Sequence, residues 1–375
     1  MLSNKENGSE RVRVTSWGTL PDGRNVRTYT LTNTNGVSVR ISDLGAALVS
    51  WIAPDGDGLP GEILLGHDTP GEYLTSGAYM GALVGRWANR IEAARFNLDG
   101  VEYPLIPNEG QNLLHGGVNG FHQRLWESEQ DGDSVVMRLD SPDGDGGFPG
   151  NLQVQVRYTL SEDNALAIEY LALTDRATPV NLTSHPYFNL AAQPDCDIRA
   201  HRLKIQSDAF FEVDSALIPR QCASVDGGPF DFRHEASIGS RLDVRHPQLE
   251  LAQGFDHCYV LRDGADIPTN TSSPGLADLT RVRPVATVVD PESGRMLTVS
   301  TDQAGLQFYS GNRLEGTQGR GGVPYRSHAG FCLEAGGFPN QINMPDSRAL
   351  IATSEIPYRQ VTVYQTGVLA RQTAQ

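Results

Sequence analysis

The sequence predicts an antiparallel all-β protein, and three features support this. Polar and apolar residues alternate with a period of two in 152–160, 37–41 and 360–364, as in half-buried strands that have one wet face. Asp-Gly and Asn-Gly pairs separate such runs and supply turn backbone. Hardly any window has the spacing of a long amphipathic helix. Strands that follow one another through tight turns favour antiparallel pairing.

Further β-rich runs extend this pattern along the chain. They are 28–32, 47–52, 134–139, 165–173, 285–289, 296–300 and 306–309. No repeat of fixed period is present, which disfavours a propeller or solenoid. We expect residues 1–10 to be a flexible leader and 11–375 to form a single domain. The segment 262–281 is rich in Asp, Thr, Ser, Pro and Gly, and is expected to be a surface loop or insertion.

The charge of the chain limits its partners. With 45 acidic residues against 30 Lys and Arg, the formal net charge is −15. Nucleic acids and anionic membranes attract clustered positive charge, so neither is an expected partner, and a neutral substrate fits better. No run approaches the roughly 18 apolar residues of a membrane helix. The first residues lack an apolar segment of signal-peptide type, so a cytoplasmic location is expected.

The four cysteines do not form a metal-binding pattern. Cys196, Cys222, Cys258 and Cys332 lie far apart and include no Cys-x-x-Cys pair. Their spacing alone also allows disulfides, but in the expected compartment they are interpreted as reduced, mostly buried thiols.

Two histidines beside turn-forming residues are candidates for proton transfer. His115 precedes Gly116 and Gly117, which allow a strained turn and close approach of a ligand. His185 precedes Pro186, which favours an extended backbone, and imidazole titrates near working pH. The residues alone also allow a surface turn histidine at 115 and a histidine packed at a strand end at 185.

Two carboxylates lie in otherwise apolar runs. Glu334 follows Leu333 and precedes Ala335, so we expect burial to raise its pKa and make it a usable base. A structural, salt-bridged glutamate is the alternative. Asp256 lies in the apolar run 255–261 and needs a partner or a ligand. Its neighbour His257 is expected on the opposite face of the strand, without a role in the site.

Arg90 and Asn89 offer donors suited to sugar hydroxyls, although a surface pair would look the same. Arg86 and Trp87, in the same segment, are expected to be core and rim residues. The stretch 319–322 lacks the Gly-Lys-Ser/Thr of a phosphate-binding loop, and the chain has no Gly-x-Ser-x-Gly elbow. With no metal-ligand triad in the sequence, we expect neither a metal nor another cofactor.

Taken in order, these segments resemble the aldose 1-epimerase (galactose mutarotase) family from about residue 18 to residue 366. The distinctive matches are His115-Gly116-Gly117 and Ser184-His185-Pro186-Tyr187-Phe188-Asn189. The remaining matches are 85–91, 112–117, 120–121, 124–126, 147–152, 229–233, 254–256, 309–312, 333–334 and 358–359.

The resemblance implies a large antiparallel β-sandwich, the galactose mutarotase-like supersandwich, with few short helices and the sugar in an open cleft. It implies an isomerase that interconverts the α and β anomers of free hexoses such as galactose or glucose. For this reaction we expect the base to take the O1 proton and the acid, as imidazolium, to protonate the ring oxygen O5. The sequence does not determine which histidine is charged at rest. The residues that match the family's site are Glu334 (base), His185 (acid), His115 (near the ring oxygen), and Arg90, Asn89 and Asp256 (sugar hydroxyls).

Several alternatives stay open. The position two residues after the base is usually Gln in the family and is Gly336 here, so the preferred sugar is not determined. A hexose-6-phosphate 1-epimerase would need a cationic pocket near C6. A non-catalytic sugar-binding protein would keep the cleft alone, and a glycosidase would need Glu334 and Asp256 at a set separation. A monosaccharide partner and a monomer or homodimer are expected.

Overall fold

The computed structural model describes residues 11–193, 195–262, 281–345 and 347–369. The expected leader 1–10 and residues 263–280 of the expected loop lie outside the described residues.

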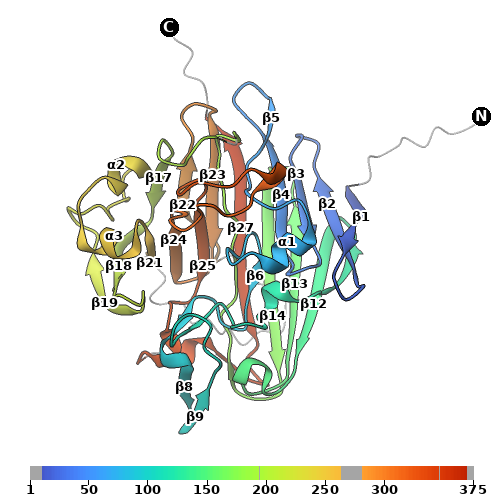
Figure 1. Ribbon diagram of the computed structural model, residues 1–375, viewed down its shortest axis with the longest axis vertical. Helices are drawn as coiled ribbons and strands as arrows, with labels where there is room; N and C mark the ends of the chain where they lie inside the picture. The colour runs from blue at the N-terminus through green and yellow to red at the C-terminus, as the bar shows by residue number, and fades with distance from the viewer. Residues whose placement is uncertain (1–10, 194, 263–280, 346, 370–375) are drawn as a thin grey trace, which may run out of the picture.

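The largest sheet has nine strands, and each strand pairs with its neighbours antiparallel. Their order is β11 (Glu127–Asp131), β12 (Ser134–Ser141), β13 (Leu152–Leu160), β14 (Ala165–Thr174), β27 (Tyr358–Val368), β23 (Arg295–Thr301), β22 (Arg283–Val289), β17 (Arg202–Ile205) and β20 (Ala236–Ser237). Figure 1 shows the long β27 passing through the centre of the molecule.

Two five-stranded antiparallel sheets complete the β-sandwich. The first contains β1 (Val12–Thr19), β2 (Asn25–Thr32), β3 (Ser38–Ser42), β4 (Leu48–Pro54) and β5 (Pro60–Glu62). The second has the order β19 (Pro219–Ser224), β18 (Ser207–Val213), β21 (Asp256–Leu261), β24 (Gly305–Tyr309) and β25 (Cys332–Gly336). Tyr29, Ile168 and Leu306, one from each of the three sheets, belong to one buried hydrophobic cluster. The sheets therefore share a core.

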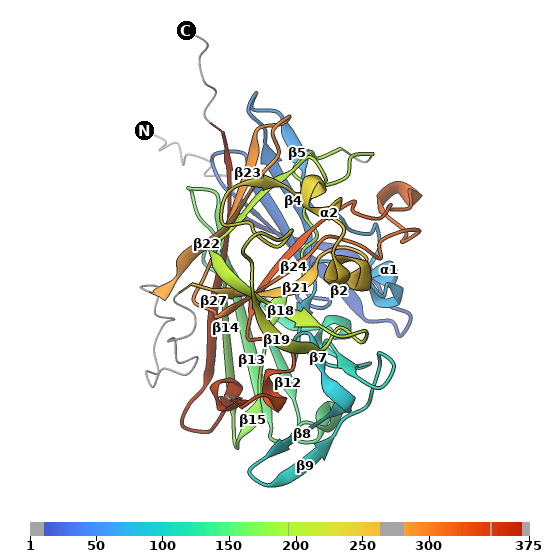
Figure 2. The ribbon, with the colours of Figure 1, turned by 90° about the vertical axis from the view of Figure 1, so that its left-hand side faces the viewer.

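Short elements connect the sheets. Two-stranded ladders join β7 (Arg90–Ile91) to β10 (Leu113–Leu114), β6 (Leu83–Val84) to β16 (Thr183–Ser184), β15 (Thr178–Pro179) to β26 (Ile351–Ala352), and β8 (Arg95–Leu98) to β9 (Val101–Pro104). The α-helices α1 (Pro70–Thr75), α2 (Ile238–Leu242) and α3 (Pro247–Ala252) lie at the periphery (Figures 1 and 2). The 3₁₀ helices are η1 (Glu92–Ala94), η2 (Phe121–Gln123), η3 (Asp145–Gly147), η5 (Arg320–Gly322), η6 (Gln341–Asn343) and η7 (Ser347–Leu350).

The predicted antiparallel all-β class with few short helices is confirmed. The predicted strand runs lie in strands, except that residues 37 and 47 directly precede β3 and β4. All four cysteines are free thiols; Cys258 and Cys332 are buried, whereas Cys222 is exposed. Within the described residues, no helix combines the length and the apolar character that crossing a bilayer requires.

The prediction that 360–364, which lies in β27, has one solvent-exposed face is wrong. Gln360 is 0% exposed and Thr362 is 1% exposed, so the polar face of 360–364 is buried. The reason is that this face meets the backbone of β25, where the Gln360 amide donates to the Ala335 carbonyl at 3.0 Å. A buried amide that keeps a hydrogen-bond partner avoids most of the cost of leaving water.

Candidate active site

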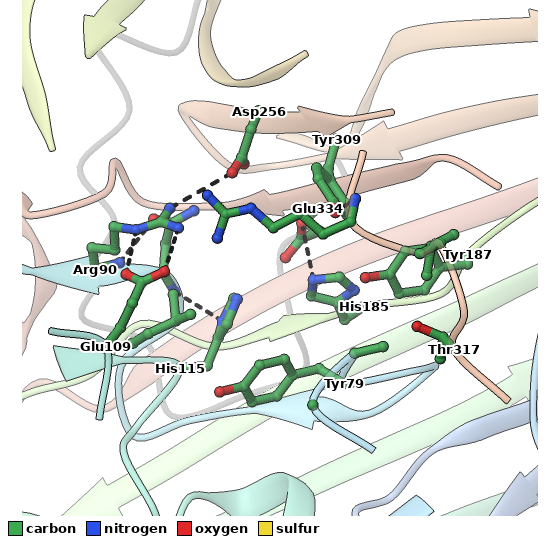
Figure 3. Close-up of a pocket in the computed structure, with 16 residues that line it drawn as sticks. Tyr79, Arg90, Glu109, His115, His185, Tyr187, Asp256, Tyr309, Thr317 and Glu334 are labelled. Carbon is green, nitrogen blue, oxygen red and sulfur yellow. Dashed lines mark hydrogen bonds and ion pairs between the residues drawn. The ribbon is translucent and has the colours of Figure 1, made fainter. Parts of the chain in front are cut away.

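A polar cavity of about 340 Å³ lies where β21 and β25 of the second five-stranded sheet meet the short ladders. All six residues named from the sequence line it: Asn89, Arg90, His115, His185, Asp256 and Glu334. Figure 3 labels all of these except Asn89. The other residues that line it are Gly77, Ala78, Tyr79, Glu109, Leu114, Tyr187, Tyr309, Arg313, Leu314 and Thr317.

Strand register places the two carboxylates on one face of a sheet. Glu334 of β25 lies opposite Gln307 of β24, which in turn lies opposite Cys258 of β21. Asp256 is two residues before Cys258 and shares its face, because side chains alternate along a strand. Gln307 Nε2 donates to Asp256 Oδ1 at 2.7 Å and so orients that carboxylate. His257 faces the other way, as expected, and its Nε2 lies 3.1 Å from Gln248 Oε1.

The loops on the other side of the cavity have a strained backbone. Tyr79, Asn89 and His115 have φ angles of 55°, 65° and 51°. Non-glycine residues adopt this left-handed region at a cost, and such residues gather at functional sites. Gly116, at φ 79°, is required sterically, because a Cβ there would lie 1.9 Å from the Gly85 carbonyl oxygen. The His-Gly-Gly motif therefore turns the backbone tightly and directs His115 into the cavity.

Arg90 is held by two carboxylates and is only 5% exposed. Its Nε and Nη2 donate to Glu109 at 2.7 and 2.8 Å, and its Nη1 lies 3.8 Å from Asp256 Oδ2. Burial opposes the positive charge, but Asp256 and Glu109 outweigh it and raise the pKa of Arg90. The guanidinium is therefore a fixed, charged donor beside two acceptors, a set that suits several sugar hydroxyls.

His185 and Glu334 form a buried acid–base pair, with His185 Nε2 at 3.5 Å from Glu334 Oε1. Burial, with the nearby charge of Asp256, raises the pKa of Glu334 well above its usual range, as the sequence led us to expect. Burial lowers the pKa of His185 to about 4. The imidazole is therefore neutral near pH 7, which answers the question of its resting protonation that the sequence left open. The Nδ1 of His185 contacts the Cys332 sulfur at 3.5 Å.

The protonation of His115 follows from its backbone contact. The Asn89 N–H donates to His115 Nδ1 at 3.2 Å, so the neutral ring carries its proton on Nε2. Burial lowers the pKa of His115 well below its usual value. The ring is therefore a neutral hydrogen-bond donor. Its distance to His185 is 5.3 Å between ring centroids, and Tyr79 packs on it at 4.6 Å.

Among the described residues, His115, His185 and Glu334 have one ligand atom each within 4.8 Å of one another, a spacing that a metal ion could bridge. The hydrogen bonding of His115 does not fit a metal ligand. A metal-bound histidine donates its second ring N–H to an acceptor. Here the Asn89 N–H points at that second nitrogen, so metal binding at Nε2 would set two N–H groups against each other. The donor set fits proton transfer better.

Glu109, Gln307 and Tyr79 also belong to the site but were not predicted from the sequence. Glu109 was undetected because only the fold brings it to Arg90. Gln307 was detectable in principle, as a lone amide within the predicted strand 306–309. Arg86 and Trp87 are both core residues, at 3% and 0% exposure.

Gly336, which stands where the family usually has Gln, does not line the cavity. A Cβ on Gly336 would lie 3.0 Å from Asn181 Oδ1 and 3.5 Å from the Leu182 carbonyl oxygen. Asn181 Oδ1 already accepts from the Gly337 N–H at 2.9 Å. A larger side chain at 336 would thus first meet Asn181, and Gly336 is not part of the cavity lining.

A polar cavity of about 340 Å³ that holds a buried imidazole–carboxylate pair defines an enzyme that moves protons on a small polar substrate. Comparison with known proteins agrees. The sequence profile described as aldose 1-epimerase matches residues 27–365. Galactose mutarotase of Bos taurus is 39% identical over 88% of this chain and 91% of its own. Aldose 1-epimerase of Escherichia coli K12 is 39% identical over 87% and 90%.

A solved structure shows the same fold. Galactose 1-epimerase from Lactobacillus acidophilus NCFM superposes with a TM-score of 0.80 at 26% identity, covering 96% of this chain and 99% of its own. The chain belongs to the aldose 1-epimerase family.

Proposed function

We propose that this protein is an aldose 1-epimerase that interconverts the α and β anomers of a free hexose such as galactose or glucose. The observation that carries the proposal is the buried pair of His185 and Glu334, 3.5 Å apart in a polar cavity. Family membership supports the same reaction, since relatives with this sequence pattern are named galactose mutarotase and aldose 1-epimerase.

The reaction needs one base and one acid. An anomer inverts when the C1 hydroxyl loses a proton, O5 gains one, and the C1–O5 bond breaks to give the open aldehyde. Rotation about C1–C2 and ring closure on the other face give the second anomer. Glu334 takes the O1 proton and His185 delivers a proton to O5; on closure they exchange roles. Each positioned proton transfer is typically worth about 10² to 10⁴ in rate.

The pair must hold one proton in total, and its location decides reactivity. Burial favours the neutral arrangement, with the proton on Glu334 and a neutral His185. The reactive arrangement has the proton on His185 and the charge on Glu334. The proton passes between them when the 3.5 Å separation closes to hydrogen-bond length, and the sugar hydroxyls and the Arg90 guanidinium stabilise the resulting carboxylate.

The other residues bind and orient the sugar. The Nε2–H group of His115 donates a hydrogen bond near the ring oxygen and stabilises the charge that develops there. Arg90, Asn89 and Asp256 bind hydroxyls, so that C1 lies between the acid and the base. Glu109 holds the guanidinium of Arg90 in place.

The charges in the cavity favour a free sugar over a sugar phosphate. Arg90 is already paired with Glu109 and Asp256, and a phosphate would be close to both carboxylates. Arg313 is the other cation in the lining, and it is exposed at the rim. We also propose that the enzyme acts in the cytoplasm as a monomer or homodimer, without a nucleic-acid partner.

Polarimetry tests the proposal. Freshly dissolved α-D-galactose and α-D-glucose should relax to their normal equilibrium rotation faster with the protein than without it. Acceleration with glucose 6-phosphate alone would support the phosphosugar alternative. Binding of both sugars with no acceleration would support the binding protein, and release of nitrophenol from a nitrophenyl glycoside would support a glycosidase.

A further inference from the structure

The strand that carries the proposed base is an edge strand. Among the strands that the structure describes, β25 is the last of its sheet and pairs only with β24. An edge strand presents backbone groups that the sheet itself does not pair, and it moves more easily than a central strand. The carbonyls of Leu333 and Ala335 flank Glu334 directly, so their environment determines where the base lies.

Side chains from outside the sheet hydrogen-bond both carbonyls. Tyr364 Oη donates to the Leu333 carbonyl at 2.9 Å, and Gln360 Nε2 donates to the Ala335 carbonyl at 3.0 Å. Both come from β27, the central strand of the nine-stranded sheet, and both are 0% exposed. The polar face of β27 thus fixes the edge of the neighbouring sheet at the position of the base.

A third donor connects the base to the acid. Thr183 Oγ1 donates to the same Ala335 carbonyl at 2.9 Å. Thr183 lies in β16, two residues before His185, so this bond joins the segment that carries the acid to the strand that carries the base. Gln360 is itself fixed, because the Tyr358 hydroxyl donates to its Oε1 and the Leu182 N–H donates to that hydroxyl at 3.1 Å.

We propose that Tyr364, Gln360 and Thr183 are positioning residues that set the spacing between Glu334 and His185. None of the three lines the cavity, so they act through the backbone of β25 and do not touch the sugar. A misplacement of about 1 Å at reacting groups can cost on the order of 10²-fold in rate. The inference rests on the assignment of Glu334 as the base.

The first test compares two tyrosines of similar surroundings. Tyr364→Phe removes the donor to Leu333, whereas the control Tyr158→Phe removes an equally buried hydroxyl that donates to the Ala46 carbonyl at 2.6 Å, away from β25. We expect Tyr364→Phe to lower kcat for galactose about tenfold with KM changed less than twofold, and to shift the pH profile of kcat. The control should stay within about twofold in both constants. Equal effects of the two substitutions would overturn the proposal.

A second pair of variants distinguishes a positioning effect from a loss of folding. Thr183→Val removes the hydroxyl that donates to Ala335, and Thr183→Ser keeps it. A fall in kcat with valine, restored by serine at equal thermal stability, supports positioning; wild-type kcat in Thr183→Val contradicts it. The outcome is separable from the base assignment. An inactive Glu334→Gln combined with fully active Thr183→Val and Tyr364→Phe would overturn the positioning role alone.

Discussion

At the scale of single residues, burial sets the chemistry of the site. Glu334 and His185 are 6% and 5% exposed, and the loss of water moves both pKa values away from the charged forms. With the pKa of the carboxyl raised and that of the imidazole lowered, the resting proton lies on Glu334, and the reactive form requires its transfer to His185.

The pH dependence of kcat/KM follows from this pair. The pair is active with one proton, is doubly protonated below the pKa of about 4 assigned to His185, and loses its last proton above the raised pKa of Glu334. We therefore expect a broad plateau through neutral pH, a fall toward pH 4 and a second fall on the alkaline side. Polarimetric rates, corrected for the uncatalysed reaction at each pH, measure this. A fall in kcat/KM that centres on the ordinary pKa of a free histidine would contradict the assignment.

Glu109 is expected to matter for sugar binding. Glu109→Gln replaces a charged, bidentate partner of Arg90 by a neutral one, which should free the guanidinium to move. We expect KM for galactose to rise roughly five- to thirtyfold, with a smaller change in kcat. Glu129→Gln is the matched control, since Glu129 pairs with Arg138 at 2.6 Å on the surface. An unchanged KM in Glu109→Gln would contradict the role.

At the scale of elements, strands were predictable and loop contacts were not. The strand 152–160 was predictable because successive side chains of a strand point to opposite faces, so burial of one face leaves a period of two in the sequence. The sequence also indicated Glu334 and Asp256, because a charge inside an apolar run is unusual. The pairing of Glu109 with Arg90 depends on how the loop that carries Glu109 folds against β7, which leaves no local pattern. The buried polar face of β27 was misinterpreted as wet, because alternation does not show which face is covered.

The turn after His115 is an element whose glycine is required. In Gly116→Ala the added Cβ would clash with the Gly85 carbonyl, in addition to the strain of a positive φ. We expect the free energy of unfolding to fall by about 3 kcal/mol or more and activity to be lost. Gly132→Ala is the control: its φ is 61° and no atom lies within 4 Å, so only the φ strain of about 1 kcal/mol applies. Chemical denaturation of both variants measures the difference.

At the scale of the whole molecule, buried histidines couple stability to pH. Burial lowers the pKa of six of them: His67, His115, His122, His185, His201 and His257. Because the unfolded chain then binds more protons below about pH 6.5, stability rises with pH and is lost as pH falls toward 4. The raised pKa values of Glu334, Asp43 and Asp302 act in the opposite direction, but these groups are fewer.

We therefore expect the melting temperature to fall on the order of 10 °C between about pH 7 and pH 5. Scanning calorimetry across this range measures it. His257→Gln removes one of the buried titrating groups, whose pKa is about 3, and should make the dependence shallower. Replacement of the exposed His234 by Gln should leave it unchanged. A melting temperature that is constant from pH 7 to pH 5 would contradict this coupling.

The most direct test of the acid–base pair is anomer exchange in the variants Glu334→Gln and His185→Asn, measured by NMR on equilibrated galactose, together with sugar binding by calorimetry. We predict that both variants still bind galactose and that each slows enzyme-catalysed exchange by about 10² to 10⁴. Exchange at the wild-type rate in Glu334→Gln, with galactose bound, would contradict the central claim that Glu334 is the base.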